Sequence, residues 1–236
     1  MSSGRLCLLI GNTRWHWAEE HSGEWNFSHT SPDSMELLRM KDRLAAWASV
    51  GPIPEGVFLE PGTNLALDDV PIKCLPPWLG IDRALAAWGA LRRAKKEPMK
   101  FDGILVADAG TVLSLTRLNA DGEFAGGQLL PGLGLQLASM AERAQALQNP
   151  GIGKVVDSKF PLETSHAMRR GSLQSLIGAL IEAQIDSQLP IWLCGGDSSL
   201  LFDYLRHRQI PLALYPNLVL EGMVDVCARI SSGLDR

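Results

Sequence analysis

The sequence predicts an α/β protein built from two similar halves, each opening with three β-strands. Short apolar runs that stop at Gly alternate with longer stretches of helical periodicity. A spacing also repeats: Gly11 precedes Gly23-Glu24-Trp25 by twelve positions, and Gly110 precedes Gly122-Glu123-Phe124 by the same twelve. Two copies are too few for a stacked array. We therefore expect two related halves facing one another across a cleft, with chance spacing as the alternative.

The first half, residues 1–99, is expected to contain five strands and two helices. Apolar or alternating segments predict the strands. Apolar spacing with a cap at Asp33 or Ser34 predicts the first helix, and Ala and Leu enrichment predicts the second, which Glu97-Pro98 ends. The expected strands are 5–11, 14–20, 24–29, 56–60 and 71–75, and the helices are 34–47 and 81–94.

The second half, residues 100–236, repeats this order. A buried strand stops at Gly110, and a turn at Asp121-Gly122 separates two further strands. The expected strands are 103–108, 112–118, 123–130, 190–196 and 211–215, and the helices are 133–147, 163–188, 200–207 and 219–230.

Composition excludes several classes of function. The 236 residues are 46% hydrophobic and carry a net charge of -4, which gives no general attraction for nucleic acid. We find no signal peptide and no apolar run long enough for a membrane span. The cysteines lie far apart in apolar runs, which favours buried thiols over zinc or disulfides: Cys7, Cys74, Cys194 and Cys227. We expect a cytoplasmic protein.

Three glycine-containing turns have the composition of phosphate-binding loops. They are Gly11-Asn12-Thr13, Asp108-Ala109-Gly110-Thr111 and Gly195-Gly196-Asp197, and each follows a buried strand. Glycine lets backbone N–H groups approach a phosphate, and Thr or Asn adds a side-chain donor. Tight hairpins need the same residues for conformational reasons. Asp108 is the more informative residue, because a carboxylate that ends an apolar strand must be solvated or bound to a cation.

The segment Gly80-Ile81-Asp82-Arg83 begins a predicted helix. On local sequence alone, Asp82 is best explained as a helix cap. An Asp beside an Arg also suits a base paired with an anchor for a carboxylate. A second glycine-rich segment, Gly126 to Gly132, is equally compatible with a tight corner and with ligand approach.

Together and in order, these segments resemble the type III pantothenate kinases of the acetate/sugar kinase–Hsp70–actin superfamily. The matching segments span nearly the whole chain: residues 11–13, 80–83, 108–111, 122–132 (GEFAGGQLLPG) and 195–197. The resemblance implies an actin-like ATPase fold of two ribonuclease-H-like halves, each a mixed sheet with flanking helices around a cleft. It also implies a homodimer that phosphorylates pantothenate to 4'-phosphopantothenate with ATP, the first step of coenzyme A biosynthesis.

The resemblance implies a role for each matching residue. Asp82 resembles the catalytic base, and Asp108 resembles the residue that binds a monovalent cation, potassium or ammonium. The segment that resembles the pantothenate site is Gly80, Ile81, Asp82 and Arg83, with Thr164 contributed by the partner subunit. The residues that resemble ATP phosphate contacts are Gly11, Asn12, Thr13, Gly110 and Thr111. Magnesium would arrive with ATP.

Two residues depart from the family pattern. The family's first turn is DxGNT, but this chain has Leu9 where the Asp belongs, and the internal repeat aligns Leu9 with Asp108. A leucine can neither ligate magnesium nor hold a water on it. Lys73 stands where the family often has Tyr. We expect an active kinase. The alternatives are a catalytically weakened accessory regulator that binds nucleotide or pantothenate, and a sugar or acetate kinase, which the short chain disfavours.

Overall fold

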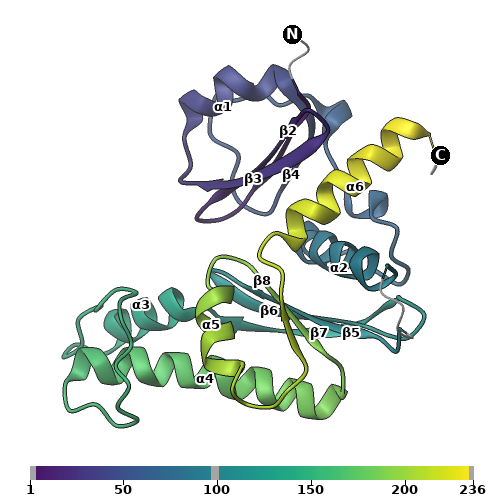
Figure 1. Cartoon of the computed structure of the whole chain (residues 1–236). Helices are drawn as coiled ribbons and strands as arrows, with labels where there is room; N and C mark the ends of the chain where they lie inside the picture. The colour runs from purple at the N-terminus through teal and green to yellow at the C-terminus, as the bar shows by residue number, and fades with distance from the viewer. Residues whose placement is uncertain (1–3, 97–100, 234–236) are drawn as a thin grey trace. The chain divides into compact units, whose positions relative to one another are not determined.

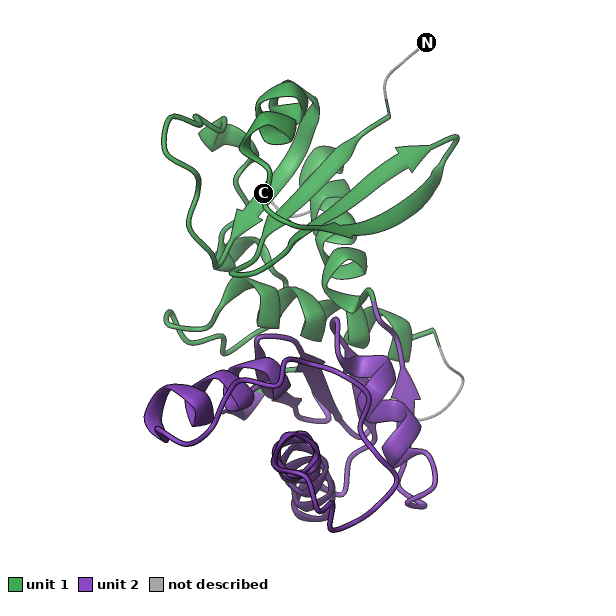
Figure 2. Ribbon diagram, turned by 90° about the vertical axis from the view of Figure 1, so that its left-hand side faces the viewer, with its two compact units in different colours: residues 1–101, 122–124, 217–236 green, residues 102–121, 125–216 purple. Residues whose placement is uncertain are grey.

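The computed structural model describes residues 4–96 and 101–233, which form two compact units (Figure 2). Unit 1 comprises the described residues of 1–101, 122–124 and 217–236, and unit 2 comprises 102–121 and 125–216. Unit 1 therefore includes a segment from the C-terminal end of the chain. The division into halves at residue 99 stays a prediction.

Unit 1 contains a four-stranded sheet with the order β3-β2-β1-β4. Its strands are β1 (Leu6–Ile10), β2 (Trp15–His21), β3 (Glu24–Thr30) and β4 (Leu44–Ser49). The first three pair antiparallel, and β4 runs parallel to β1. Ser22 and Gly23 both have positive φ, as a tight hairpin turn requires. The predicted opening of three strands is confirmed.

The helix expected over residues 34–47 is only half right. Helix α1 (Ser34–Met40), capped by the Asp33 carboxylate, passes into the 3-10 helix η1 (Lys41–Arg43), and then β4 begins at Leu44. Leu44 and Trp47 have helical spacing, but both are buried in the core that β4 forms with β1. Tertiary pairing has overridden the local pattern.

The strands expected at 56–60 and 71–75 are also wrong. The structure describes this whole segment and places it in turns and two short 3-10 helices, η2 (Pro61–Thr63) and η3 (Leu67–Asp69). Its one ladder contact is a bridge between Trp47 and Asn64. Prolines interrupt the segment, and each removes a backbone donor that a strand needs.

Two helices of unit 1 cross in backbone contact. Helix α2 (Ile81–Ala94) has the predicted bounds, and α6 (Leu218–Ser232) is slightly longer than predicted. A Cβ on Gly89 would lie 2.3 Å from the Leu218 carbonyl oxygen, and a Cβ on Gly222 would lie 2.0 Å from that of Leu85. Glycine is therefore required on both helices. The predicted terminator of α2, Glu97-Pro98, lies outside the described residues.

Polar side chains extend this helix contact. The Asp225 carboxylate accepts from Trp88 Nε1 at 2.9 Å and from Arg92 Nε at 3.1 Å. Arg93 forms a bidentate pair with Glu221, with Nη2 donating to Oε1 at 2.8 Å. The contact between α2 and α6 therefore combines close backbone packing with charge-assisted hydrogen bonds.

Unit 2 repeats the strand arrangement in a five-stranded sheet of order β7-β6-β5-β8-β9 (Figure 1). Its elements are β5 (Ile104–Ala109), β6 (Val112–Leu118), β7 (Phe124–Pro131), α3 (Leu133–Arg143), α4 (Thr164–Ser187), β8 (Ile191–Cys194), α5 (Ser198–Leu205) and β9 (Leu212–Leu214). Strand β5 pairs antiparallel with β6 and parallel with β8. Apolar residues of α4 share one core with β5 and β6. The predicted α/β class, with two mixed sheets and flanking helices, is confirmed.

All four cysteines are free thiols, and Cys7, Cys194 and Cys227 are buried as predicted. Cys74 is exposed, because the segment expected to be a strand is a turn in which Cys74 itself has positive φ. Within the part of the chain that the structure describes, no helix is both long and apolar enough to cross a membrane.

Gly222→Ala tests the contact between α2 and α6. The added methyl group meets the Leu85 carbonyl, so we expect unfolding to become easier by about 1–3 kcal/mol in urea denaturation. Gly178→Ala on α4 is the matched control: its Cβ position has no neighbour within 4 Å, so helix propensity should raise stability by up to about 1 kcal/mol. Equal effects of the two substitutions would contradict the close contact.

Candidate functional site

The first predicted turn, Gly11-Asn12-Thr13, joins β1 to β2 and is held by backbone bonds. Gly11 N donates to the Arg14 carbonyl at 3.1 Å, while Val50 N and Gly51 N both donate to the Ile10 carbonyl, at 2.9 and 3.1 Å. A Cβ on Gly51 would lie 2.3 Å from the Gly11 oxygen. The loop after β4 therefore packs directly on the turn, while the side chains of Asn12 and Thr13 stay exposed.

The Gly80–Arg83 segment lies beside the same loop. Gly80 is the N-cap of α2, and a Cβ there would lie 3.8 Å from Val50 Cγ1 and 2.5 Å from Asp82 Oδ1. Within unit 1, Val50 and Gly51 thus link the first turn to the start of α2. This proximity depends on β4, which the sequence did not predict.

Asp82 combines features of both of its predicted roles. Gly80 occupies the cap position, and the N–H of Arg83 is shared between the Asp82 carboxylate at 2.8 Å and the Gly80 carbonyl at 3.1 Å. Burial raises the pKa of Asp82, although the Arg83 N–H and guanidinium oppose the rise. Burial also lowers the pKa of Arg83, which is 8% exposed. A carboxyl with a raised pKa is better matched to general-base work near neutral pH than an ordinary Asp.

In unit 2 the second and third predicted turns meet. Asp197 N donates to the Ala109 carbonyl at 2.8 Å. Gly195 has φ +87°, and a Cβ there would lie 2.2 Å from Asp108 Oδ1. Only glycine at position 195 leaves room for the Asp108 carboxylate, which closes the turn after β5 against the turn after β8.

The end of the glycine-rich segment joins this cluster. Gly132 N donates to the Thr111 carbonyl at 2.9 Å, and a Cβ on Gly132 would lie 2.1 Å from the Gly110 carbonyl oxygen. The cluster therefore brings three segments that are far apart in the sequence together around one turn, whose Thr111 is exposed.

Two oxygen atoms of this cluster, of the kind that hard cations bind, pack against Gly195: Asp108 Oδ1 and the Ala109 carbonyl oxygen, which also accepts from Asp197 N. Across residues 4–96 and 101–233, no group of three or more His, Cys, Asp or Glu side chains is arranged to hold a metal ion. Magnesium is commonly held by one or two carboxylates together with substrate phosphates, which needs no such protein cluster.

The remaining predicted residue, Thr164, is exposed at the first turn of α4 in unit 2. The residues predicted to bind pantothenate, Gly80–Arg83 and Thr164, therefore belong to different compact units.

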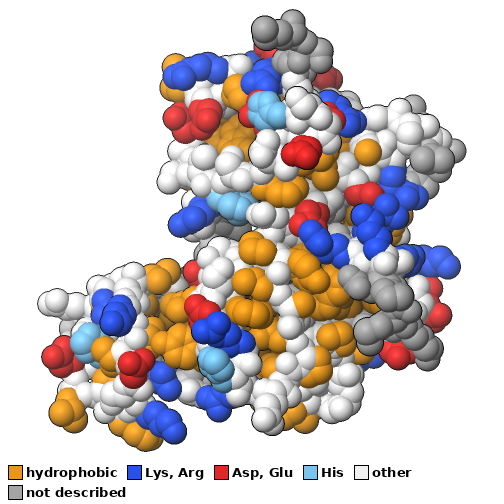
Figure 3. All heavy atoms as spheres, viewed as in Figure 1, with side chains coloured by type: hydrophobic (Ala, Val, Ile, Leu, Met, Phe, Trp, Pro, Cys, Tyr) orange, Lys and Arg blue, Asp and Glu red, His pale blue; other side chains and the backbone are white. Residues whose placement is uncertain are grey.

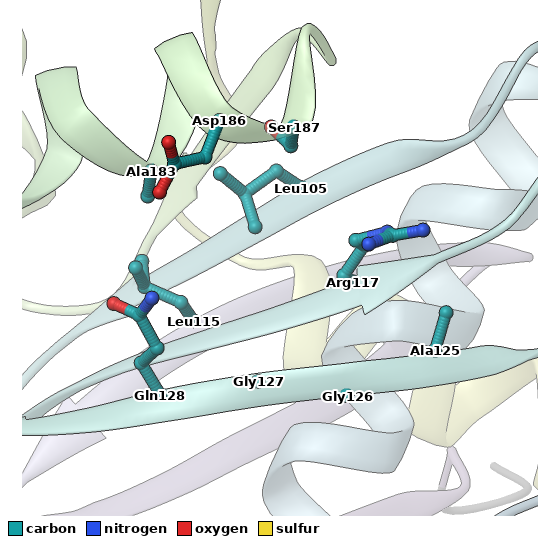
Figure 4. A pocket seen from close by; sticks show the side chains of 10 residues that line it. All are labelled: Leu105, Leu115, Arg117, Ala125, Gly126, Gly127, Gln128, Ala183, Asp186 and Ser187. Carbon is teal, nitrogen blue, oxygen red and sulfur yellow. The ribbon is translucent and has the colours of Figure 1, made fainter.

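A hollow of about 180 Å³ on unit 2 is separate from the turn cluster (Figure 4). None of the residues that line it belongs to the three turns, although one of them, Leu115, follows Ser114, the strand partner of Asp108. It is lined by Leu105, Leu115, Arg117, Ala125, Gly126, Gly127, Gln128, Ala183, Asp186 and Ser187. Gly126 and Gly127 thus border this hollow, whereas Gly132 belongs to the turn.

One polar residue beside the first turn was missed in the sequence. His16 on β2 pairs across the strands with Leu9, which is 3% exposed. Its Nε2 lies 3.2 Å from the position of a Gly11 Cβ. The signal that could have found it is the strand register, which places a histidine opposite the position where the family has an Asp.

Known proteins with similar sequences belong to one family. The family of type III pantothenate kinases matches residues 62–187. The type III pantothenate kinase of Thermosynechococcus vestitus is 34% identical, over 85% of this chain and 80% of its own. That of a Nostoc species is 34% identical, over 96% of this chain and 95% of its own.

Solved structures share the fold at lower identity. A Campylobacter jejuni protein described as a Baf family transcriptional activator has a TM-score of 0.63 and 19% identity, covering 96% of this chain and 99% of its own. A Sinorhizobium meliloti protein described as a 2-dehydro-3-deoxygalactonokinase has a TM-score of 0.60 and 12% identity, with the same coverage. At these identities the two solved structures show a similar fold only. The two pantothenate kinases above, in contrast, are similar in sequence over most of their length. The chain belongs to the type III pantothenate kinase family.

Proposed function

We propose that this protein transfers the γ-phosphate of ATP to the hydroxyl of pantothenate, giving ADP and 4'-phosphopantothenate, the first step of coenzyme A biosynthesis. The observation that carries the proposal is Asp82, a half-buried carboxyl with a raised pKa at the start of α2, in a member of this family. The proposed setting is the cytoplasm.

In the proposed reaction Asp82 accepts the proton of the attacking hydroxyl. The hydroxyl oxygen forms a bond to the γ-phosphorus, the bond from that phosphorus to the β,γ-bridging oxygen breaks, and ADP leaves with the bonding electrons. Gly80, Ile81 and Arg83 bind the substrate, with the Arg83 guanidinium pairing with its carboxylate. The close packing of Gly80 on Asp82 supports this role, because it holds the carboxyl at the helix start.

The glycine turns are the proposed contacts of ATP. Gly11, Asn12 and Thr13 in unit 1, and Gly110 and Thr111 in unit 2, would lie against the phosphates: the N–H groups of Gly11 and Gly110 hold the turns through Arg14 and Val112, and Asn12, Thr13 and Thr111 would supply donors to the phosphate oxygens. Magnesium bound with ATP would neutralise the charge that develops on the phosphates. Asp108 would hold the monovalent cation, and its position as a half-buried carboxylate in the apolar strand β5 supports this role.

We further propose a homodimer in which Thr164 of one subunit contacts pantothenate bound to the other. Unit 2 carries apolar side chains in solvent, and Figure 3 shows hydrophobic side chains over the region of α3 and α4. The exposed set is Val112, Leu129, Leu135, Ile152, Phe160, Leu162 and Ile185. Contiguous exposed apolar patches are typical of interaction surfaces, and we propose that the members over α3 and α4 form one.

Leu9 is the feature that favours the alternative, a weakened accessory regulator, because a buried leucine supplies no oxygen to the first turn. The relatives with clear sequence similarity are type III pantothenate kinases. The protein described as a transcriptional activator shares only the fold with this chain. Asp82, Arg83 and Asp108 are all present, so we retain the kinase as the proposal.

Asp82→Asn should lower turnover by about 10²–10⁴-fold, because the amide cannot accept a proton. The fold should persist. Burial raises the pKa of Asp82 in the folded state, so at pH values above the usual pKa range of Asp the ionised carboxylate destabilises the fold. The neutral amide of Asn removes this destabilisation. The melting temperature should therefore stay level or rise. Asp33→Asn is the matched control, since Asp33 caps α1 and Asn caps as well. Near-normal turnover of Asp82→Asn would make Asp82 a structural residue only.

Pantothenate-dependent ADP release should fall sharply when potassium is replaced by sodium, because an oxygen site sized for potassium fits sodium poorly. Asp108→Asn should remove this difference while leaving a low residual rate. Equal rates of the unsubstituted protein in the two salts would dismiss the cation role of Asp108.

Mixing two inactive variants, Asp82→Asn and Thr164→Arg, tests the shared site. A heterodimer regains one intact site from its two unaltered parts, so activity should partly return after dissociation and reassociation. The control pairs Asp82→Asn with a subunit that carries both substitutions, which leaves no intact site. If heterodimers are confirmed but activity does not return, or if a monomer is fully active, the partner subunit does not contribute Thr164 to the site.

A further inference from the structure

A chain of three polar side chains connects the first turn to the start of α6 within unit 1. His16 on β2 and His29 on β3 are cross-strand partners, and their Nδ1 atoms lie 2.7 Å apart. His29 Nε2 lies 3.0 Å from Oδ1 of Asn217, the N-cap residue of α6. The Asn217 side chain makes no capping bond to its own helix, so it is committed to His29.

The partners fix which ring nitrogens carry protons. Oδ1 of Asn217 can only accept, so His29 Nε2 must donate. In the tautomer with its proton on Nε2, His29 accepts at Nδ1, and His16 Nδ1 donates to it. His16 is consequently left with an unprotonated Nε2, which is a hydrogen-bond acceptor.

His16 is neutral under ordinary conditions. Burial lowers its pKa to about 4, and the neighbouring His29 and Arg14 act in the same direction. The lone pair on Nε2 is therefore present at neutral pH, and the fixed tautomer keeps it on that atom.

This acceptor lies beside the position where the chain lacks the carboxylate of the family pattern. His16 Nε2 is 3.2 Å from the position of a Gly11 Cβ, so it borders the first turn. Leu9 and His16 are directly opposite in the antiparallel β1–β2 pair, and opposite residues project from the same face of a sheet. An Asp at position 9 would therefore share this face with the imidazole.

We propose that His16 Nε2 replaces the missing carboxylate as the acceptor for a water bound to the magnesium of the ATP complex at the first turn, with His29 and Asn217 as positioning residues. The inference rests on the proposed use of ATP. The chemistry fits: magnesium prefers oxygen ligands and keeps several waters. A neutral imidazole is a poor direct ligand for it but a good acceptor for a polarised water. His29 and Asn217 hold His16 through a chain of hydrogen bonds, as the hydrogen-bond partners of histidines do at metal sites.

The test is the affinity for a non-hydrolysable ATP analogue, measured by calorimetry with magnesium and again with EDTA. His16→Asn keeps an amide near Nδ1 for the bond to His29 but removes the group at Nε2. His16→Gln places an amide oxygen near Nε2 instead. We expect His16→Asn to weaken binding about threefold to tenfold in magnesium only, the loss typical of one hydrogen bond. His16→Gln should keep most of the affinity.

Three further variants sharpen the result. His21→Asn, at the exposed far end of β2, should bind like the unsubstituted protein. His29→Leu should lose as much as His16→Asn, whereas His29→Asn, which retains an acceptor for His16, should lose less. Leu9→Asp added to His16→Asn should restore binding in magnesium, because it returns the carboxylate to the same face of the sheet.

Several outcomes would overturn the inference: no loss in His16→Asn, an equal loss with magnesium and with EDTA, or no binding of the magnesium–nucleotide complex by the unsubstituted protein. If the variant with Leu9→Asp does not fold, the comparison of His16→Asn with His16→Gln decides alone. The assay contains no pantothenate. A protein that binds nucleotide as expected but does not phosphorylate pantothenate would therefore contradict the proposed function and leave the inference on His16 standing.

Discussion

The contact between α2 and α6 is the constraint on which unit 1 depends. Gly89 and Gly222 let the two helices approach until each backbone touches the other, and no side chain would fit between them. Helix α2 begins with the segment that holds Asp82, and the N-cap residue of α6, Asn217, is bonded to His29. One helix crossing therefore sets the positions of both the candidate base and the polar chain that reaches the first turn.

The two units use the same strand arrangement for different local chemistry. In each, a β-meander is followed by a strand that runs parallel to the first, and a glycine turn follows that first strand. Position 108 of β5 carries a half-buried carboxylate packed on Gly195, whereas position 9 of β1 carries a buried leucine. Both copies have a glycine directly after the first strand, but residues 11–14 join β1 to β2 whereas only residues 110 and 111 join β5 to β6, and the polar groups are divided unequally between the copies.

The sequence predicted best the features that depend on local pattern. The bounds of α2 followed from its Ala and Leu content, and the three strands that open each half followed from alternation and turn residues. The predictions failed where pairing with a strand distant in the sequence determines the secondary structure. Residues 44–47 have helical spacing but pair with β1, and residues 56–60 and 71–75 have apolar content but no strand partner.

For the site, too, local motifs were predicted and long-range contacts were not. Each glycine turn was visible as a motif, but its neighbours were not. The bond from Asp197 to the Ala109 carbonyl, and the packing of Gly132 on Gly110, join segments tens of residues apart. His16 was overlooked because its meaning comes from strand register, through which it stands opposite Leu9. A motif search compares residues that are neighbours in the sequence, whereas these contacts join residues that are distant in the sequence.

The central claim is that the chain remains a pantothenate kinase although Leu9 has replaced the acidic residue of its first turn. The most direct measurement is ADP release with ATP, magnesium and potassium, comparing pantothenate with a panel of sugars and acetate, and with the product mass determined. We predict ADP release that depends on pantothenate and a product heavier by one phosphate. ADP release at the same rate without an acceptor, or preference for a sugar or acetate, would contradict the claim.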